Sequence, residues 1–525
     1  MYNNRMWLIV LGLALFFSSL NLFHVFYYAT RIPTNAIFMG ISHWYEDYFF
    51  YLSLLTQGQM GAFHLTNLYT TEPVPIGINW SINLALGILA RFTSLPVWIV
   101  YDGSIFLFSL TYIFLAYWIL RRLFPANGLH RVSALLIALA SSTAVPFFYS
   151  YTPALNRLGG IAHHVAQNIM TLTAIYLFAQ ILDHIRDKRL IPIRKLAVLC
   201  ITLLVLFATS SFYVAVDMVV FLLASCIVIV QTRSRRTTKL IVLIFIFLAL
   251  PLAILSGTQV ELLNNPFWQF VRDWEANQPA VDFGTFFRSM GPLALLLPIG
   301  IGPFLKRGTT LRTIGAIFAL GQIALYFSPI PKWFGLPAFR ILQPPAYVFF
   351  GAIAVSGLGV IASIGKRKRS LLFGFFVVGF LVLQIPGIVS EVQTRVSSYY
   401  LNSPLNFVDR HTYEGLLYLK KLPRQKNVLA FQTLETLVPA ISGHRVYAGH
   451  GTLTIDYATK IGNVAAFYSF AFTQEEARRF LTDNTIGYVL WQKDLNEAAN
   501  AQRRYGFLIR EYENSSLTIF SVRNE

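Results

Sequence analysis

The chain has 525 residues, of which 55% are hydrophobic and only 13% charged, and its mean hydropathy is +0.55. Soluble domains carry about 25% charged residues, so this composition excludes an ordinary soluble protein and indicates one that crosses a membrane repeatedly. The formal net charge is +18, but residues 1–389 carry 27 Lys and Arg against 11 Asp and Glu, whereas residues 390–525 carry 15 against 13. Because the excess basicity accompanies the apolar segments, we interpret it as a topology signal and not as a nucleic-acid surface.

Eleven apolar segments are predicted to be membrane spans, so the expected fold class is an α-helical polytopic membrane protein. In residues 1–389, 20 of the 27 Lys and Arg residues fall in loops on the side of the N-terminus. By the positive-inside rule that side is the cytoplasm, and the C-terminus then lies outside the plasma (inner) membrane. The first span lacks a small-residue cleavage site, and we expect it to be retained. The predicted spans are 7–27, 101–120, 131–149, 164–183, 196–211, 213–230, 239–256, 290–305, 312–328, 343–364 and 370–389.

Residues 1–389 are thus predicted to form one transmembrane domain, in which residues 28–100 are a long first outer loop. The later part of this loop, 82–91, is apolar but short of the roughly 20 residues that a span needs. We interpret it as an interfacial or re-entrant amphipathic helix, because a further span here would place the Arg-rich loops outside.

Residues 390–525 are predicted to form a small extracytoplasmic α/β domain, because charged residues become frequent and the apolar runs shorten to strand length. Thr473 is a predicted N-cap, followed by two Glu residues in the first helical turn. Strands that alternate with helices predict a sheet that is at least partly parallel. The expected helices are 414–421 and 473–482, and the expected strands are 427–431, 445–447, 486–490 and 517–522.

A pair of carboxylates, Glu46 and Asp47, follows the first predicted span closely. Ionised carboxylates are costly near hydrocarbon, so a pair at this position favours a functional role. A positioned carboxylate can take the proton from an acceptor hydroxyl, and we assign this general-base role to Asp47, with Glu46 assisting. The alternative is that both are solvated residues stabilised by a helix N-terminus.

The first outer loop resembles that of the GT-C superfamily of integral membrane glycosyltransferases. The resemblance rests on Asp47, on Tyr51 four positions later, on Gly58 and Gly61, and on the apolar stretch from Leu86 to Arg91. It implies many spans, a catalytic acidic residue early in the first outer loop, and a soluble C-terminal domain outside the membrane. It also implies a sugar donor carried on polyprenyl phosphate, with Tyr51 in substrate binding. Some members have Asp before Glu, the reverse of the order here, which leaves open which carboxylate is the base.

Basic residues on the outer side are candidates for phosphate binding. The resemblance implies that Arg340, between prolines before the tenth span, contacts the lipid phosphate, and a guanidinium suits such a contact. Lys332 and Arg157 are further candidates for substrate binding. The alternative for Arg340 and Lys332 is that they reach toward lipid headgroups.

Three further residues are candidate substrate contacts. His163 and His164 begin the fourth span, but adjacent helical positions diverge by about 100°, so the two do not readily bind one metal ion. Asp217 lies within the sixth span, where a carboxylate indicates function by default; it faces either the substrate cavity or a neighbouring hydroxyl. Residues 442–452, rich in Gly and His, are read either as a structural loop or as a contact to a polar acceptor.

The function we expect is transfer of a sugar from a polyprenyl-phosphate donor to an outward-facing glycan, lipid or protein acceptor, without nucleic acid. The resemblance leaves a divalent metal ion open, because some relatives use one and others do not, and the sequence offers no ligand set. The first alternative is a transporter or flippase of a lipid-linked or small substrate, although internal repeats are lacking. The second is a polysaccharide polymerase or ligase that uses a lipid-linked oligosaccharide.

Overall fold

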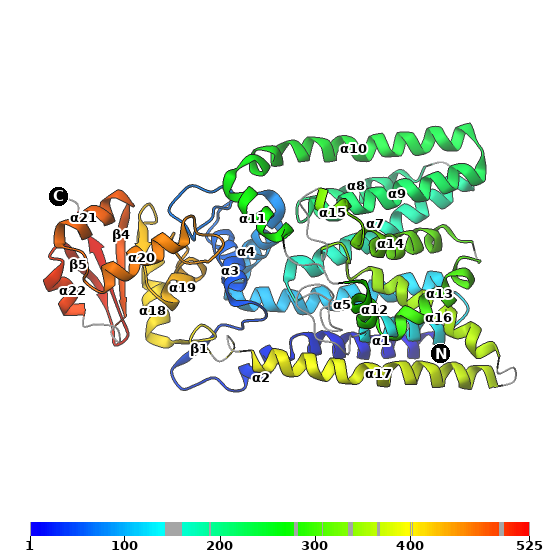
Figure 1. The fold of residues 1–525 in the computed structure, drawn as a ribbon, viewed down its shortest axis with the longest axis horizontal. Coiled ribbons are helices and arrows are strands. Elements are labelled where there is room, and N and C mark those ends of the chain that lie inside the picture. The colour runs from blue at the N-terminus through cyan, green and yellow to red at the C-terminus, as the bar shows by residue number, and fades with distance from the viewer. Residues whose placement is uncertain are drawn as a thin grey trace. The chain divides into compact units, whose positions relative to one another are not determined.

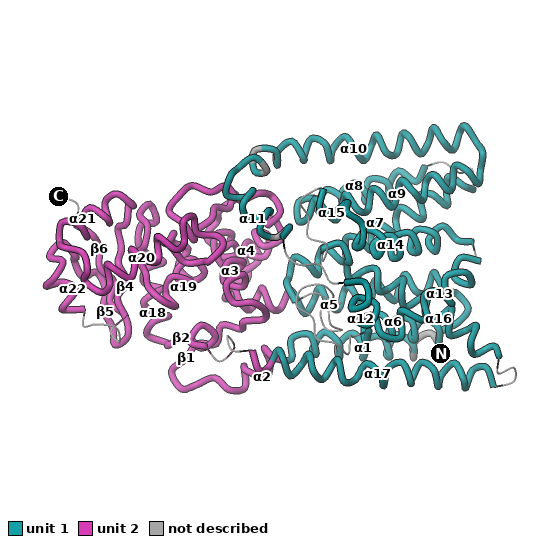
Figure 2. Tube along the Cα trace, in the orientation of Figure 1, with its two compact units in different colours: residues 1–23, 105–395 teal, residues 24–104, 396–525 magenta. Residues whose placement is uncertain are grey.

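A computed structural model of the chain describes residues 2–141, 160–187, 189, 191–277, 282–306, 308–333, 340–364, 368–398, 401, 403–492 and 498–523. The chain forms two compact units, and each unit combines segments that are far apart in the sequence (Figure 2). We call residues 1–23 with 105–395 the helical unit, and residues 24–104 with 396–525 the mixed unit.

The helical unit consists of apolar helices, and every one of the eleven predicted spans overlaps a helix (Figure 1). Among the described residues six helices are long and apolar enough to cross a membrane, or seven if α1 and α2 form one broken span. Shorter apolar helices are α6, α13 and α14. The helices are α1 (Tyr2–Asn21), α5 (Val97–Leu123), α6 (Gly128–Ala140), α7 (Ala162–Arg186), α8 (Ile193–Phe207), α9 (Ser211–Thr232), α10 (Arg235–Asn264), α11 (Pro266–Ala276), α12 (Phe283–Met290), α13 (Pro292–Leu305), α14 (Thr310–Tyr326), α15 (Ile330–Trp333), α16 (Ala346–Ser363) and α17 (Arg369–Ser397).

Small residues let helices of this unit approach closely. A Cβ atom on Gly300 of α13 would lie 2.0 Å from the backbone oxygen of Ile353 in α16. Such contacts between backbones are typical of helices that pack in a membrane, where small residues at the interface allow close packing. Large apolar side chains meanwhile remain exposed along α10 and α17, among them Leu250 and Leu371. This distribution is that of a helix bundle with a lipid-facing surface.

The mixed unit contains the first outer loop and the C-terminal part of the chain. Its larger sheet has the order β3-β4-β6-β5, in which β3 and β4 are parallel and the other pairs antiparallel. The elements are α2 (Phe23–Ala29), β1 (Ala36–Phe38), α3 (Tyr45–Gln59), η1 (Ile78–Trp80), α4 (Ser81–Thr93), β2 (Phe407–Asp409), α18 (Arg410–Leu419), β3 (Asn427–Leu429), α19 (Thr433–Ser442), α20 (Tyr457–Tyr468), α21 (Gln474–Asp483), β4 (Ile486–Gln492), α22 (Ala498–Arg504), β5 (Leu508–Glu513) and β6 (Leu517–Val522).

Several sequence predictions for the sheet region are confirmed. Thr473 is the N-cap of α21, and its side chain and that of Glu476 form a capping box. The strand predicted at 445–447 is wrong: there only Val446 forms an isolated parallel bridge, to Val428. Strand β5 was not predicted. Most of its residues are exposed and polar, so its sequence shows neither a continuous apolar run nor a regular apolar–polar alternation.

The first outer loop is bound to the C-terminal segment by backbone pairing. Strand β1 pairs antiparallel with β2, so that Ile37 lies opposite Val408. Val446 N–H donates to Leu68 O at 2.9 Å, and Asn67 Nδ2 donates to Leu453 O at 2.7 Å. These bonds fix the loop after α3 against the segment between α19 and α20.

Helices α3 and α4 pack through glycines that the sequence had singled out. A Cβ atom on Gly58 would lie 2.7 Å from Leu84 O, and one on Gly87 would lie 2.2 Å from Leu55 O. Gly61 has φ +91° and a Cβ there would meet the Arg91 guanidinium. The predicted amphipathic helix is therefore α4, and these glycines place it directly against α3.

Candidate functional site

Glu46 and Asp47 occupy the first turn of α3, the helix N-terminus that the alternative interpretation of the sequence described. The N-cap residue is Trp44, whose side chain makes no capping bond to the helix. Its indole Nε1 instead donates to Glu46 Oε2 at 3.3 Å. Negative side chains are stabilised at this end of a helix by the exposed N–H groups and the helix dipole. The helix end thus holds two carboxylates side by side without a capping residue in competition.

His450 faces Asp47 from the loop between α19 and α20. The backbone N–H groups of Thr452 and Leu453 both donate to His450 Nδ1, at 3.2 Å each. Because Nδ1 accepts these bonds, the ring proton resides on Nε2. Nε2 lies 3.8 Å from Asp47 Oδ1, and only 3% of the His450 side chain is exposed, against 48% for Asp47. A buried imidazole of fixed tautomer thus lies beside a carboxylate that solvent can reach, and its Nε2 makes no hydrogen bond among the described residues.

A third carboxyl group, Glu435 in the first turn of α19, belongs to the same cluster. Burial, followed by the negative charge of Glu46, raises the pKa of Glu435 to about 8. The pKa of Tyr457 is raised by burial and then by Glu435 and Glu46. Tyr69 is fully buried, and burial and then Glu46 raise its pKa well above the usual range. At neutral pH the cluster therefore contains a carboxylic acid and two phenols that keep their protons beside the carboxylates.

The loop that carries Tyr69 is held in place by an ion pair in which the lysine is buried and the glutamate is partly exposed. Lys460 in α20 lies 2.6 Å from Glu72 Oε2, and its side chain is only 7% exposed. The Lys460 ammonium also donates to the hydroxyls of Thr70 and Thr71. An ammonium with three acceptors satisfies its donors even where water is largely excluded. This ion pair connects the first outer loop to α20, the helix that also carries Tyr457 of the cluster.

Aromatic rings line α3 just after the carboxylates. The ring of Tyr51 stacks on Tyr101 with centroids 6.2 Å apart and lies 5.4 Å from Trp80. His43 packs against the same tyrosine at 5.5 Å. Tyr51 is buried, so its position one turn after Asp47 is fixed by this stack. These rings pack on one another and hold the part of α3 that follows the carboxylates.

The remaining candidates lie in the helical unit. Asp217 in α9 is fully buried, and within the described part of the chain neither of its oxygens accepts a hydrogen bond. Tyr213, one turn before it, interacts electrostatically with both Asp217 and Arg340. The structure therefore brings Asp217 and Arg340 to the same tyrosine, a pairing that no spacing between them indicates.

The two histidines and the other basic candidates differ in their surroundings. His163 is buried and contacts His164 edge to face, with centroids 4.5 Å apart. Lys332 is exposed on α15. Arg157 lies outside the described residues. Within the described ranges no three His, Cys, Asp or Glu side chains are grouped as a metal ion would require.

Sequence reasoning underestimated the 442–452 segment and missed two members of the cluster. His450 stands between two glycines, and a Cβ on Gly451 would lie 3.6 Å from Glu46 Oε1, so this backbone passes close to the carboxylates. The Gly-His-Gly pattern was a visible signal, but nothing in its spacing pointed to residues 400 positions earlier. Glu435 gave no local signal, because its role depends on burial beside Glu46.

No protein-family profile matches the chain, and no curated protein matches its sequence. Solved structures do match its fold. The apo oligosaccharyltransferase of Archaeoglobus fulgidus matches with a TM-score of 0.53 and 13% identity, over 93% of this chain and 70% of that one. The same enzyme tethered to an acceptor peptide gives a TM-score of 0.50 and 12% identity, over 98% and 74%. The mycobacterial arabinofuranosyltransferase AftD gives 0.51 and 13%, over 99% of this chain but only 40% of AftD.

These likenesses establish a GT-C-like fold for the chain, and the resemblance seen in its first outer loop is confirmed at that level. The match to the oligosaccharyltransferase extends over 93% of the chain and so includes both units. At identities of 12–13% the comparison concerns the fold, and the chemistry of this chain must be argued from its own residues.

Proposed function

We propose that the chain is a membrane-embedded glycosyltransferase that moves a sugar from a polyprenyl-phosphate donor to an outward-facing acceptor, with Asp47 as the general base. The observation that carries this proposal is the Asp47 carboxylate, half-exposed at a helix N-terminus and faced by the buried N–H of His450. The fold fits, since the matched structures are an oligosaccharyltransferase and an arabinofuranosyltransferase. The Glu46–Asp47 turn then lies on the extracytoplasmic side of the plasma membrane, together with residues 390–525.

The chemistry uses one proton and one leaving group. The acceptor hydroxyl attacks C1 of the sugar while its proton passes to the Asp47 carboxylate. The bond between C1 and the phosphate oxygen breaks, and the electron pair leaves with the polyprenyl phosphate. The growing negative charge on this phosphate needs a cation or donors. In the helical unit Arg340 is the candidate for this contact, beside Tyr213.

His450 is assigned a positioning role in this mechanism. Its Nε2 proton stabilises the charged form of Asp47 and limits the orientations of the carboxylate. Glu46 accepts a hydrogen bond from the Trp44 indole, and we assign it the assisting role. The protonated Glu435 can donate a hydrogen bond to an oxygen in the cluster without adding a third negative charge.

The test compares Asp47→Asn with Glu46→Gln in purified full-length protein. The assay measures transfer of radiolabelled sugar from polyprenyl-phosphate donors to a panel of glycan, lipid and peptide acceptors, with and without EDTA. We expect Asp47→Asn to lower transfer by about 10²- to 10⁴-fold, and Glu46→Gln to lower it less.

Asp483→Asn, an exposed carboxylate at the end of α21, is the matched control and should transfer normally. Normal transfer by Asp47→Asn would overturn the assignment of the base. Movement of lipid-linked substrate across a bilayer by the wild-type chain, without any transfer, would overturn the enzyme proposal in favour of a flippase.

A further inference from the structure

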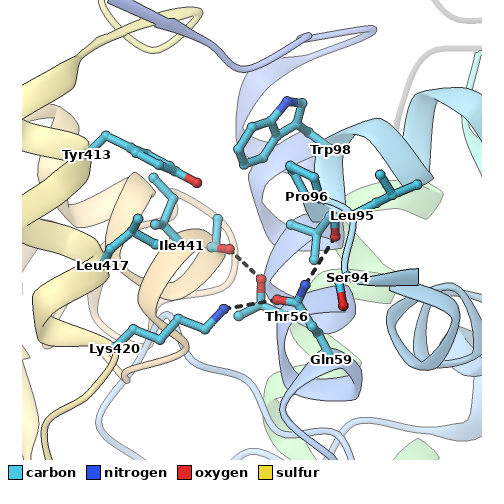
Figure 3. A pocket seen from close by; sticks show the side chains of 12 residues that line it. Thr56, Gln59, Ser94, Leu95, Pro96, Trp98, Tyr413, Leu417, Lys420 and Ile441 are labelled. Atoms are coloured by element: carbon cyan, nitrogen blue, oxygen red, sulfur yellow. Dashed lines mark hydrogen bonds between the residues drawn. The ribbon is translucent and has the colours of Figure 1, made fainter. Parts of the chain in front are cut away.

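A cavity of about 210 Å³ lies in the mixed unit at the opposite end of α3 from the carboxylates. Figure 3 shows its walls, which come from the end of α3, the α4–α5 turn, α18 and α19. Thr56 and Gln59 line it, nine and twelve positions after Asp47, and an α-helix rises 1.5 Å per residue. The cavity is therefore about 14–18 Å from Asp47 along the helix axis.

Two aromatic residues dominate one side of this cavity. The rings of Trp98 and Tyr413 meet edge to face, with centroids 5.8 Å apart and an interplanar angle of 84°. Both side chains are half-buried, so part of each ring remains accessible. In Figure 3 the two rings face the same space, and the Tyr413 hydroxyl is directed into it. Leu417 and Ile441 complete the apolar part of the wall.

The polar side of the cavity is held in position by its own hydrogen bonds. Lys420 Nζ donates to Gln59 Oε1 at 2.9 Å, and Gln59 Nε2 donates to Leu95 O at 3.2 Å (Figure 3). An ammonium has three donors, so two of them stay available at Lys420. The chain thus fixes the position of this cation before any ligand is bound.

Two further donors in the cavity have no hydrogen-bond partner among the described residues. They are the Tyr413 hydroxyl and the indole N–H of Trp98. Burial raises the pKa of Tyr413 to about 12, so its hydroxyl keeps its proton at neutral pH. Both side chains are half-buried and partly open, so a ligand that enters the cavity can accept from these donors. An apolar ligand would leave these donors unpaired, and a simple anion would leave the rings uncovered.

We propose that this cavity binds one pyranose ring of a saccharide acceptor. A sugar has an apolar C–H face that covers Trp98 and a ring of hydroxyl oxygens that accept from Tyr413 and Lys420. The term acceptor rests on the proposed transfer reaction; the binding of a sugar does not. The distance from Asp47 places the bound ring several sugar units away from the hydroxyl that reacts, so the site recognises an oligosaccharide.

The test measures binding by saturation-transfer difference NMR with the full-length protein in detergent. The probes are methyl α-pyranosides of glucose, mannose, galactose and N-acetylglucosamine, with glycerol 3-phosphate as the lipid-headgroup probe. We expect at least one pyranoside to give signals from its ring protons. Tyr413→Phe, which keeps the ring and removes the hydroxyl, should weaken that signal by about fivefold, equivalent to about 1 kcal/mol.

Matched controls separate the cavity from general effects. Tyr418→Phe changes a tyrosine of the same helix that donates instead to Glu511 O and stacks on Tyr512. Trp118→Phe changes a tryptophan further along α5. Both should bind as the wild type does, whereas Trp98→Phe should bind more weakly. Equal signals in all variants, no pyranoside signal, or a signal from glycerol 3-phosphate alone would each overturn the proposal.

Transfer assays distinguish this failure from failure of the proposed function. In Asp47→Asn we expect pyranoside binding to persist while transfer is lost. In Tyr413→Phe we expect a raised KM for an oligosaccharide acceptor, with kcat and the KM of the lipid donor unchanged. Transfer that is unaffected by the cavity variants would overturn the acceptor assignment and leave the general base in place. Pyranoside binding in a chain without any transfer would overturn only the proposed function.

Discussion

Arg312 in the helical unit and Asp47 in the mixed unit are both charged, but the protein treats them in opposite ways. Arg312 is 2% exposed, donates from Nη1 to Phe304 O at 2.7 Å and from Nη2 to Leu123 O, and lies 5.0 Å from the Phe304 ring. Asp47 stays 48% exposed, and His450 Nε2 lies 3.8 Å from its Oδ1. A charge enclosed by backbone oxygens serves stability, whereas a carboxylate left open beside a fixed donor is available for chemistry.

The sharpest test of this contrast is Arg312→Met. The substitution leaves the carbonyls of Phe304 and Leu123 without their donor, and each unsatisfied buried group costs about 1–3 kcal/mol. We expect the free energy of unfolding in detergent to fall by about 4 kcal/mol, with normal kcat in the protein that remains folded. Thermal unfolding and active-site titration measure the two quantities. A loss of kcat at unchanged stability would contradict the contrast.

Glu435→Gln tests the electrostatics of the open cluster through its pH dependence. In the folded state the pKa of Glu435 is raised to about 8 from an ordinary value of 4.5. Its contribution to stability is therefore fully present below pH 4.5 and is lost as the pH rises through 8. The wild type should therefore lose about 2–3 kcal/mol between pH 6 and pH 9 relative to Glu435→Gln. The measurement is the melting temperature of both proteins across this range. Parallel curves would contradict the prediction.

His450→Ala tests whether the imidazole positions the base. Loss of its N–H should lower kcat by about 10- to 30-fold, equivalent to about 1.4–2 kcal/mol, with the KM of the lipid donor unchanged. His411→Ala, an exposed histidine of α18, is the control and should transfer normally. A loss of kcat that is accompanied by a matching loss of thermal stability would assign His450 a purely structural role.

The smallest expected effect is that of Glu72→Gln. Burial opposes ionisation of Glu72, but hydrogen bonds from Lys460 and Thr70 lower its pKa below the ordinary value of 4.5. Its contribution is present above pH 4.5 and is lost as the pH falls through the lowered pKa. Because the Glu72 side chain is 39% exposed, we expect a stability difference below about 1 kcal/mol at pH 7, vanishing near pH 3. The melting temperatures of both proteins at pH 7 and pH 3 measure this difference. A larger difference at pH 3 than at pH 7 would contradict the prediction.

Local signals accounted for much of the fold but for only half of the site. The lengths of the apolar segments predicted the spans, and each predicted span overlaps a helix. The N-cap at Thr473 could be predicted because its capping box involves only residues 473–476. Asp47 was proposed as the base on a local signal as well, since a carboxylate pair early in the first outer loop is visible in the sequence. His450 and Glu435 belong to the cluster through contacts across hundreds of residues, and no local period or spacing encodes such contacts. The domain boundary expected near residue 390 likewise took no account of the pairing of β1 with β2.

The pairing of Ile37 with Val408 also governs the order of events during biogenesis. A ribosome delivers strand β1 early, but its partner β2 emerges only after all the helices of the helical unit have been synthesised. Until then the segment around α3 lacks both its sheet partner and the loop that carries His450. Contacts of such long sequence separation form late. The helices of a nascent chain are therefore inserted into the membrane before the mixed unit can fold. A chaperone or protease would meet the chain with its first outer loop still unpaired.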